Sequence, residues 1–170
     1  DQALEKLRNF LMARLRALLA EAGYTPEVIR AVLAVDARDI PWVWIRARAV
    51  TDWLATPLAG DVLTVHRRAA NLAGRAPERP VDPGAFQEPE EQRLYQDLTA
   101  ARAAVDQALV RRDCGAYFRA VAGLRPAVDA FLERVLVMAE DPALRANRLA
   151  LLREVAQLAT RVAALGELGP

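Results

Sequence analysis

The chain has 170 residues, a hydrophobic fraction of 54% and a formal net charge of +1 at neutral pH. This is enough apolar material for the core of one domain. The nearly balanced charge lacks the excess of positive charge typical of proteins that bind nucleic acid over a broad surface. Positive charge gathered on one face can still bind a polyanion, so nucleic-acid binding remains open.

Several residue types needed for catalysis are scarce. The chain has no serine, one histidine, His66, and one cysteine, Cys114, so it cannot build a serine triad, and these two residues cannot complete a zinc tetrahedron. Nothing in the spacing brings them together as a catalytic pair, and we expect Cys114 to be a small buried hydrophobe. No glycine-rich phosphate loop occurs. We therefore expect no catalytic centre, metal site or cofactor in this chain.

The sequence contains no apolar run of about 18 to 20 residues, the length that a membrane-spanning helix needs. It also lacks the basic and apolar start of a signal peptide, and a single cysteine cannot form an intrachain disulfide. We expect a cytoplasmic protein with neither a membrane nor a DNA partner. Because the chain begins without methionine inside an apparent helix, we also expect a fragment of a longer protein.

Apolar residues at three- and four-residue steps predict four helices in the first half of the chain. Gly23 is placed to end the first, and Thr25 and Asp39 are placed to cap the second and third. Thr56 with Pro57 should open the fourth. The helices are expected at residues 2–22, 26–35, 39–54 and from 57 onward.

The third helix contains Trp42 and Trp44, and Trp53 lies near its end. Large aromatic side chains at these positions favour packing between helices. Stacking of a tryptophan on a nucleic-acid base is the alternative.

One side of the fourth predicted helix carries guanidinium and amide groups within about 100° of one another on a 3.6-residue helix. This ridge could hold phosphates, with an arginine or the asparagine also reaching base edges. An ordinary solvated face is the alternative. The residues of the ridge are Thr64, Arg67, Arg68, Asn71 and Arg75.

Residues 74–89 are rich in proline and glycine and predict a linker on the surface, with Phe86 packed against the body. Helices are then expected at 90–112, 117–124 and from about 126 onward. No segment alternates with a period of two over a sustained length, so we expect no sheet. The prediction is a single all-α domain over residues 1–170, a bundle of about eight helices.

The stretch 128–152 joins two apolar helices at an acidic corner. The first helix should run to Ala139, and Asp141 followed by Pro142 has the chemistry of a helix start. Arg145, Asn147 and Arg148 fall within the apolar band of the second helix. Guanidinium groups do not enter a core unpaired, so they must meet acidic partners, carbonyl oxygens or a ligand. The candidate partners are Glu140, Glu133 and Asp129.

Residues 141–152, DPALRANRLALL, resemble the anticodon-binding helix of the all-α domain family named for its Asp-Ala-Leu-Arg motif. That domain occurs in arginyl-tRNA synthetases and in the β subunit of bacterial heterotetrameric glycyl-tRNA synthetase. The segments 81–95, 66–72 and 10–34 are similar to the glycyl β subunit, so the resemblance covers nearly the whole chain.

The resemblance implies a module that binds the anticodon region of glycine transfer RNA within a class II glycine–tRNA ligase. The active site would lie on a separate α subunit, and ATP and magnesium would belong to the holoenzyme. The RNA-binding candidates are the ridge residues together with Arg145 and Arg148. The anticodons for glycine end in two cytosines, whose exocyclic amines donate hydrogen bonds, so the readers should be acceptors: Asn71, a carboxylate or backbone carbonyls.

Two other hypotheses remain. The chain could be a helical module that docks another protein without binding RNA, or the anticodon-binding domain of an arginyl enzyme, against which the segment 81–95 argues. For Arg145 and Arg148, a structural role that holds the corner is the alternative to RNA contact.

Overall fold

In the computed structural model, which describes residues 2–74, 76 and 78–168, the chain is mainly helical. The described ranges contain eight α-helices, two short 3-10 helices and no strand, which confirms the all-α class. The α-helices are α1 (Gln2–Glu21), α2 (Pro26–Leu33), α3 (Ile40–Leu54), α4 (Leu58–Ala73), α5 (Pro89–Val110), α6 (Cys114–Ala122), α7 (Arg125–Arg134) and α8 (Pro142–Ala159). The 3-10 helices are η1 (Pro83–Ala85) and η2 (Leu165–Glu167).

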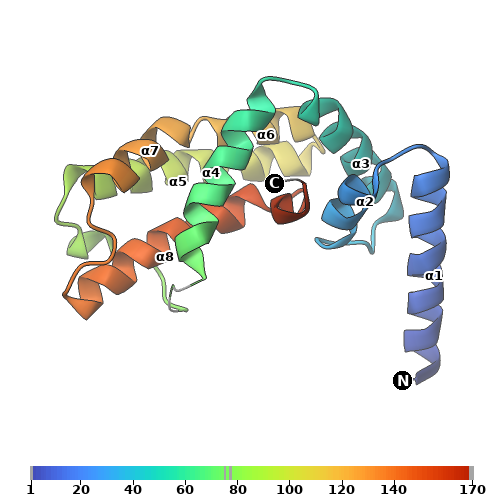
Figure 1. The fold of residues 1–170 in the computed structure, drawn as a ribbon, viewed down its shortest axis with the longest axis horizontal. Helices are drawn as coiled ribbons and strands as arrows, with labels where there is room; N and C mark the ends of the chain where they lie inside the picture. Colours follow the sequence, from blue (N-terminus) through green and yellow to red (C-terminus); the bar gives the residue numbers. More distant parts are fainter. Residues whose placement is uncertain (1, 75, 77, 169–170) are drawn as a thin grey trace.

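The helices α4 to α8 form the main body, in which α4 crosses over α8 and α5 packs against α6 and α7 (Figure 1). Helices α2 and α3 extend this body to one side and pack on each other. Figure 1 shows α1 projecting from the far end, where it meets only the neighbouring α2 and α3 region. None of the helices in the described ranges is long and apolar enough to cross a membrane.

Three of the predicted helix starts are confirmed in atomic detail. The side chains of Thr25, Asp39 and Asp141 accept hydrogen bonds from backbone N–H groups in the first turns of α2, α3 and α8. Thr56 behaves differently, because its hydroxyl donates to the carbonyl of Trp53, 2.7 Å away, and α4 has no side-chain cap. Gly23 ends α1 with a φ of +91°, a conformation that suits glycine.

Aromatic side chains pack between α3 and α6 in the core. Trp53 is buried and stacks on Phe118 with 4.1 Å between ring centroids. Tyr117 is fully buried beside Phe118, and its hydroxyl donates to the carbonyl of Ala159 at 2.6 Å. Inter-helix packing is thus the role of Trp53, and burial keeps its ring from a nucleic-acid base.

The other two tryptophans lie partly exposed near the start of α3. Trp44 packs edge-to-face on Tyr24, with the ring centroids 5.9 Å apart. Trp42 lies beneath the guanidinium groups of Arg46 and Arg112, at 5.8 and 5.6 Å from its ring centroid. Both rings therefore already have packing partners within the protein.

The helix before the corner is shorter than predicted. It ends at Arg134, and Val135 adopts an extended conformation with φ −101° and ψ 125°. Residues 135–140 alternate, with Val135, Val137 and Ala139 buried and the residues between them exposed. The expectation of a helix to Ala139 was wrong, because residues 135–139 are all apolar and fit a helix and an extended segment equally well. We call residues 135–141 the connector.

The described part of the linker, 78–88, lies across the surface of α8. Both backbone groups of Asp82 hydrogen-bond to the side chain of Asn147, the N–H to Oδ1 at 2.8 Å and the carbonyl to Nδ2 at 2.9 Å. Phe86 packs edge-to-face against Tyr95 on α5, with the ring centroids 5.6 Å apart. The predicted anchoring by Phe86 is therefore present, and Asn147 adds a second anchor.

Candidate nucleic-acid interface

The predicted ridge lies on the outer side of α4. Arg67 and Asn71 are exposed, whereas Thr64 and Arg68 are half-buried at its edge. Arg75 lies outside the described residues. The structure thus brings four of the five predicted ridge residues onto one face of a single helix, with Arg67 as its exposed cation.

Arg68 is engaged within the protein. Its guanidinium pairs with Asp129 on α7, which also pairs with Arg125, and Arg125 pairs in turn with Asp61 on α4. This chain of four alternating charges joins α4 to α7 along their seam. Because its charge is compensated locally, Arg68 adds less positive potential to the ridge than Arg67 does.

The corner between α7 and α8 contains a buried ion pair. The guanidinium of Arg148 donates from Nε and Nη2 to the two carboxylate oxygens of Glu91 on α5, at 3.0 and 3.1 Å. Glu91 is 0% and Arg148 4% exposed. Arg148 also donates from Nη1 to the carbonyl of Leu136 in the connector, at 2.9 Å. The guanidinium of Arg148 therefore joins three elements, α5, α8 and the connector.

The environment of Glu91 keeps its carboxylate ionised. Burial alone would raise its pKa, but hydrogen bonds from Arg148 and from the backbone N–H groups of Glu88 and Gln87 outweigh burial and leave the pKa below its ordinary value. The same two backbone hydrogen bonds cap the start of α5. Glu91 therefore serves both the ion pair and the helix start.

Arg145 holds the other end of the connector. Its guanidinium donates to the carbonyl of Ala139 at 2.8 Å and, more weakly, to that of Glu140 at 3.5 Å. The expected partners Glu133 and Asp129 were wrong for both arginines, and Glu140 contributes its backbone and not its carboxylate. The reason is that the connector is not helical, so its carbonyl groups lack the partners of a continuous helix and accept from the arginine side chains.

The geometry gives Arg148 a structural role, since its guanidinium points inward. Arg145 is partly exposed but is also committed to carbonyl groups. Contact between RNA and either residue remains a prediction. Among the residues predicted from the sequence, Arg67 and Asn71 are those that the structure leaves on the surface.

Two buried charged side chains with structural roles could not be identified from the sequence. Glu91 is 57 positions from its partner Arg148, and the only local signal was its place three residues after Glu88 at a helix start, as in a capping box. Arg46 is fully buried and donates to the carbonyls of Val32 and Val162, each at 3.0 Å. Its partners lie at the end of α2 and in the segment after α8, which no local pattern identifies.

The two residues considered for nucleophilic catalysis are both uncharged at neutral pH. Burial raises the pKa of Cys114 to about 11 and lowers the pKa of His66 below its ordinary value. Cys114 therefore remains a protonated thiol in the core, in agreement with the structural role expected for it. Within the described part of the chain, no group of three or more His, Cys, Asp or Glu side chains is arranged to hold a metal ion.

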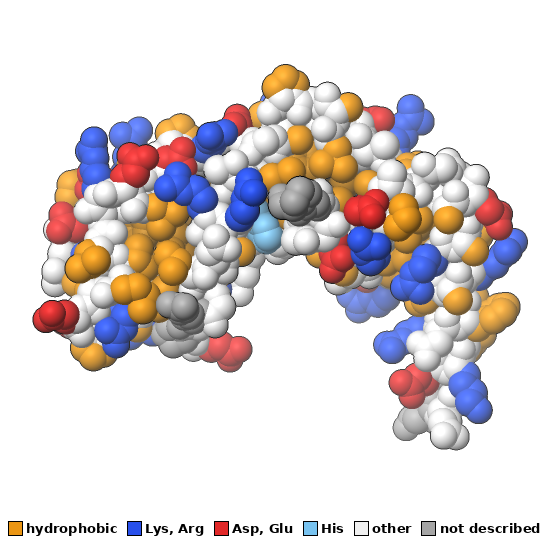
Figure 2. All heavy atoms as spheres, viewed as in Figure 1, with side chains coloured by type: hydrophobic (Ala, Val, Ile, Leu, Met, Phe, Trp, Pro, Cys, Tyr) orange, Lys and Arg blue, Asp and Glu red, His pale blue; other side chains and the backbone are white. Residues whose placement is uncertain are grey.

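Charged and apolar side chains are segregated on the face shown in Figure 2. Apolar surface is continuous to the left of α4, between α7 and the start of α8, with lysine and arginine side chains above it and beside α4. In the connector, which leads from α7 to α8, Leu136 and Met138 are 70% and 44% exposed. An apolar surface beside exposed positive charge is a combination suited to unstacked nucleotides.

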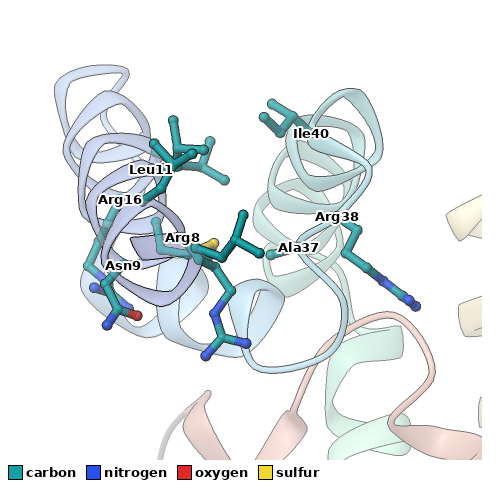
Figure 3. Close-up of a pocket in the computed structure, with 11 residues that line it drawn as sticks. Arg8, Asn9, Leu11, Arg16, Ala37, Arg38 and Ile40 are labelled. Carbon is teal, nitrogen blue, oxygen red and sulfur yellow. The ribbon is translucent and has the colours of Figure 1, made fainter. Parts of the chain in front are cut away.

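A second feature lies at the other end of the molecule, between α1 and the loop before α3. This groove has a volume of about 790 Å³ and a mostly apolar lining that includes Leu7, Leu11 and Ile40. Figure 3 shows Arg8 and Arg16 on α1 and, on the opposite side, Arg38, whose side chain points away from the groove and pairs with Asp36 at 3.0 Å. The groove is distant from α4 and contains none of the predicted site residues.

The comparisons with known proteins identify the family of the chain. The model of the DALR anticodon binding domain matches residues 62–166, which include most of α4, the connector and α8.

Glycine–tRNA ligase β subunits are similar over almost the whole chain. The protein of Desulforudis audaxviator is 40% identical over 95% of this chain and 24% of its own length. That of Desulfatibacillum aliphaticivorans is 38% identical over 94% and 23%, and that of Methylobacillus flagellatus is 34% identical over 99% and 24%. The chain thus spans about a quarter of the length of these relatives.

Proposed function

The chain belongs to the DALR anticodon-binding domain family, and from this premise we propose that it recognises the anticodon region of glycine transfer RNA. It would do so as a module of the β subunit of a glycine–tRNA ligase. The observation that carries the proposal is the similarity of nearly the whole chain to proteins named as such β subunits.

The distribution of charged groups supports the proposal. Arg148 is neutralised by Glu91 and Arg68 by Asp129, so among the predicted site residues the exposed Arg67 and Asn71 on α4 remain for a ligand. Arg67 would hold a phosphate and Asn71 could reach a base edge. In this proposal, the ATP, magnesium and glycine sites belong to the whole ligase, and its class II active site lies on a separate α subunit.

A binding titration with defined RNAs tests the proposal. The chain should shift glycine transfer RNA in a native gel at lower protein concentration than arginine transfer RNA. Replacing the anticodon cytosines of the glycine transfer RNA should remove that preference. A preference for arginine transfer RNA would instead support the arginyl alternative, and absence of binding to either would refute RNA recognition by this chain.

The groove beside α1 supports a second candidate function, docking of protein. Helix α1 exposes Leu4, Leu7, Phe10 and Leu11, although an isolated helix of this length is only marginally stable in water. Because Arg8 and Arg16 on α1 flank the apolar groove, the partner that fits it is an amphipathic helix with acidic residues beside its apolar stripe. Loss of such a complex in a Leu7→Glu variant, with transfer-RNA binding unchanged, would separate this function from RNA recognition.

A further inference from the structure

The solvent side of the connector presents an unusual row of side chains. Burial alternates along residues 135–140, because Leu136, Met138 and Glu140 are exposed while Val135, Val137 and Ala139 are buried. Leu136 is 70% and Met138 44% exposed. The connector, which is not helical and makes a turn at residues 137–138, thus exposes two large apolar side chains and a carboxylate to solvent.

Two arginine side chains of α8 hold the connector in this conformation. Arg148 holds the carbonyl of Leu136 and is itself anchored to the buried Glu91, while Arg145 holds the carbonyls of Ala139 and Glu140. A segment held at both ends by charge-assisted hydrogen bonds displays its outer side chains in a fixed geometry. The exposed row is therefore pre-organised for binding.

The exposed row lies next to the α4 ridge. The Arg68–Asp129 pair ties α4 to α7, whose end leads directly into the connector. Figures 1 and 2 show α4 and the connector on the same face of the molecule, with continuous apolar surface between them. A nucleotide strand that runs from α4 to the connector can contact both the exposed Arg67 on α4 and the apolar row.

Resting on the proposed function, we infer that the outer side of the connector is the surface that reads the anticodon bases. Leu136 and Met138 pack against the flat faces of unstacked bases, and the carboxylate of Glu140 accepts a hydrogen bond from the exocyclic amine of a cytosine. A carboxylate suits this task because cytosine presents a donor where uracil presents a carbonyl oxygen. The same carboxylate repels phosphate and the carbonyl oxygen of uracil. It therefore selects cytosine by disfavouring these groups as well as by binding the cytosine amine.

The test compares Glu140→Ala with Glu133→Ala in the 170-residue chain. Both residues are exposed, and both variants remove one negative charge near the same corner. The readout is the ratio of affinities for glycine transfer RNA and for a variant with uracil in place of the anticodon cytosines. We expect Glu140→Ala to reduce this ratio roughly tenfold. Glu133→Ala should leave the ratio unchanged, even if the lost charge raises both affinities.

A second comparison concerns the apolar pair. The double variant Leu136→Ala, Met138→Ala should weaken binding about tenfold while leaving the slope of affinity against salt unchanged, because apolar contacts release no counterions. Val110→Ala removes an apolar side chain that is 86% exposed at the end of α5 and should change nothing. Since all these residues are on the surface, melting temperatures should match the parent chain.

The outcomes distinguish the inference from the function on which it rests. If the parent chain prefers cytosine and Glu140→Ala keeps that preference, or if the double variant binds as tightly as the parent, the connector is not the reading surface and the proposed function stands. If the parent chain itself binds no transfer RNA, the proposed function is refuted and the inference falls with it.

Discussion

Removal of one partner from the Glu91–Arg148 pair should strongly destabilise the fold. In the variant Arg148→Met, an apolar side chain of similar length replaces the guanidinium, and Glu91 loses the hydrogen bonds from Nε and Nη2. The carboxylate is 0% exposed, so water cannot replace them without opening the core. The carbonyl of Leu136 loses its donor in the same variant.

The expected loss follows from the burial of the charge that remains. Breaking a buried ion pair by removing one partner costs about 3–5 kcal/mol, because the other charge is left uncompensated. A domain of this size loses roughly 2–4 °C of melting temperature per kcal/mol. Thermal unfolding followed by circular dichroism should therefore show a decrease of roughly 6–20 °C.

A neighbouring pair supplies a matched control. Glu90, the residue before Glu91, pairs with Arg134 on α7 at 3.0 Å, but the Arg134 side chain is 71% exposed. Arg134→Met removes a guanidinium from the same part of the fold and should cost less than about 1 kcal/mol. Equal destabilisation by the two variants would contradict the argument that burial determines the contribution of the pair.

The acid dependence of stability gives an independent check. Since the pKa of Glu91 is lower in the folded chain than in the unfolded chain, its contribution is fully present above its ordinary pKa of about 4.3 and is lost as the pH falls through the lower, folded value. Glu91→Gln should flatten the decline of stability below about pH 4.5. It should also reduce stability at pH 7, because Arg148 then remains buried without its counter-charge.

Three further predictions concern surface and buried polar contacts. Arg67→Ala should weaken transfer-RNA binding and reduce the salt slope by about one unit, whereas the exposed Arg48→Ala on α3 should not, as measured by titration at several salt concentrations. Asn147→Leu should release the linker at Asp82 and speed its cleavage by protease, because two hydrogen bonds are lost. Tyr117→Phe should cost about 1–2 kcal/mol in chemical denaturation, because two buried carbonyls lose their donor.

The helices and their starts followed from the sequence because their causes are local. An Asp or Thr before a proline or an apolar run accepts from N–H groups only two or three residues away, as Asp141 does from Ala143 and Leu144. The buried stripe of α4 likewise depends on spacing within one helix. Thr56 shows the limit of this rule, because its hydroxyl can equally donate to the preceding turn.

The connector could not be predicted in the same way. Residues 135–139, VLVMA, are apolar at every position, so neither a period of 3.6 nor a period of two stands out. Arg148 and Arg145 determine the conformation, because their side chains donate to carbonyls 12 and 6 residues away and so stabilise the non-helical connector. The sequence did show that these arginines required partners, but the partner Glu91 lies 57 residues away on another helix.

The placement of these arginines changes how the corner contributes to recognition. Arg148 touches the base-reading segment only through the carbonyl of Leu136, so it can affect base preference by positioning the connector and not by contact with RNA. Arg67, in contrast, lies on the surface and acts through its charge. In the folded population, Arg148→Met should therefore reduce the preference for cytosine while keeping the salt slope, and Arg67→Ala should do the reverse. If both variants changed the salt slope equally, Arg148 would have to meet phosphate directly, which its burial at 4% exposure opposes.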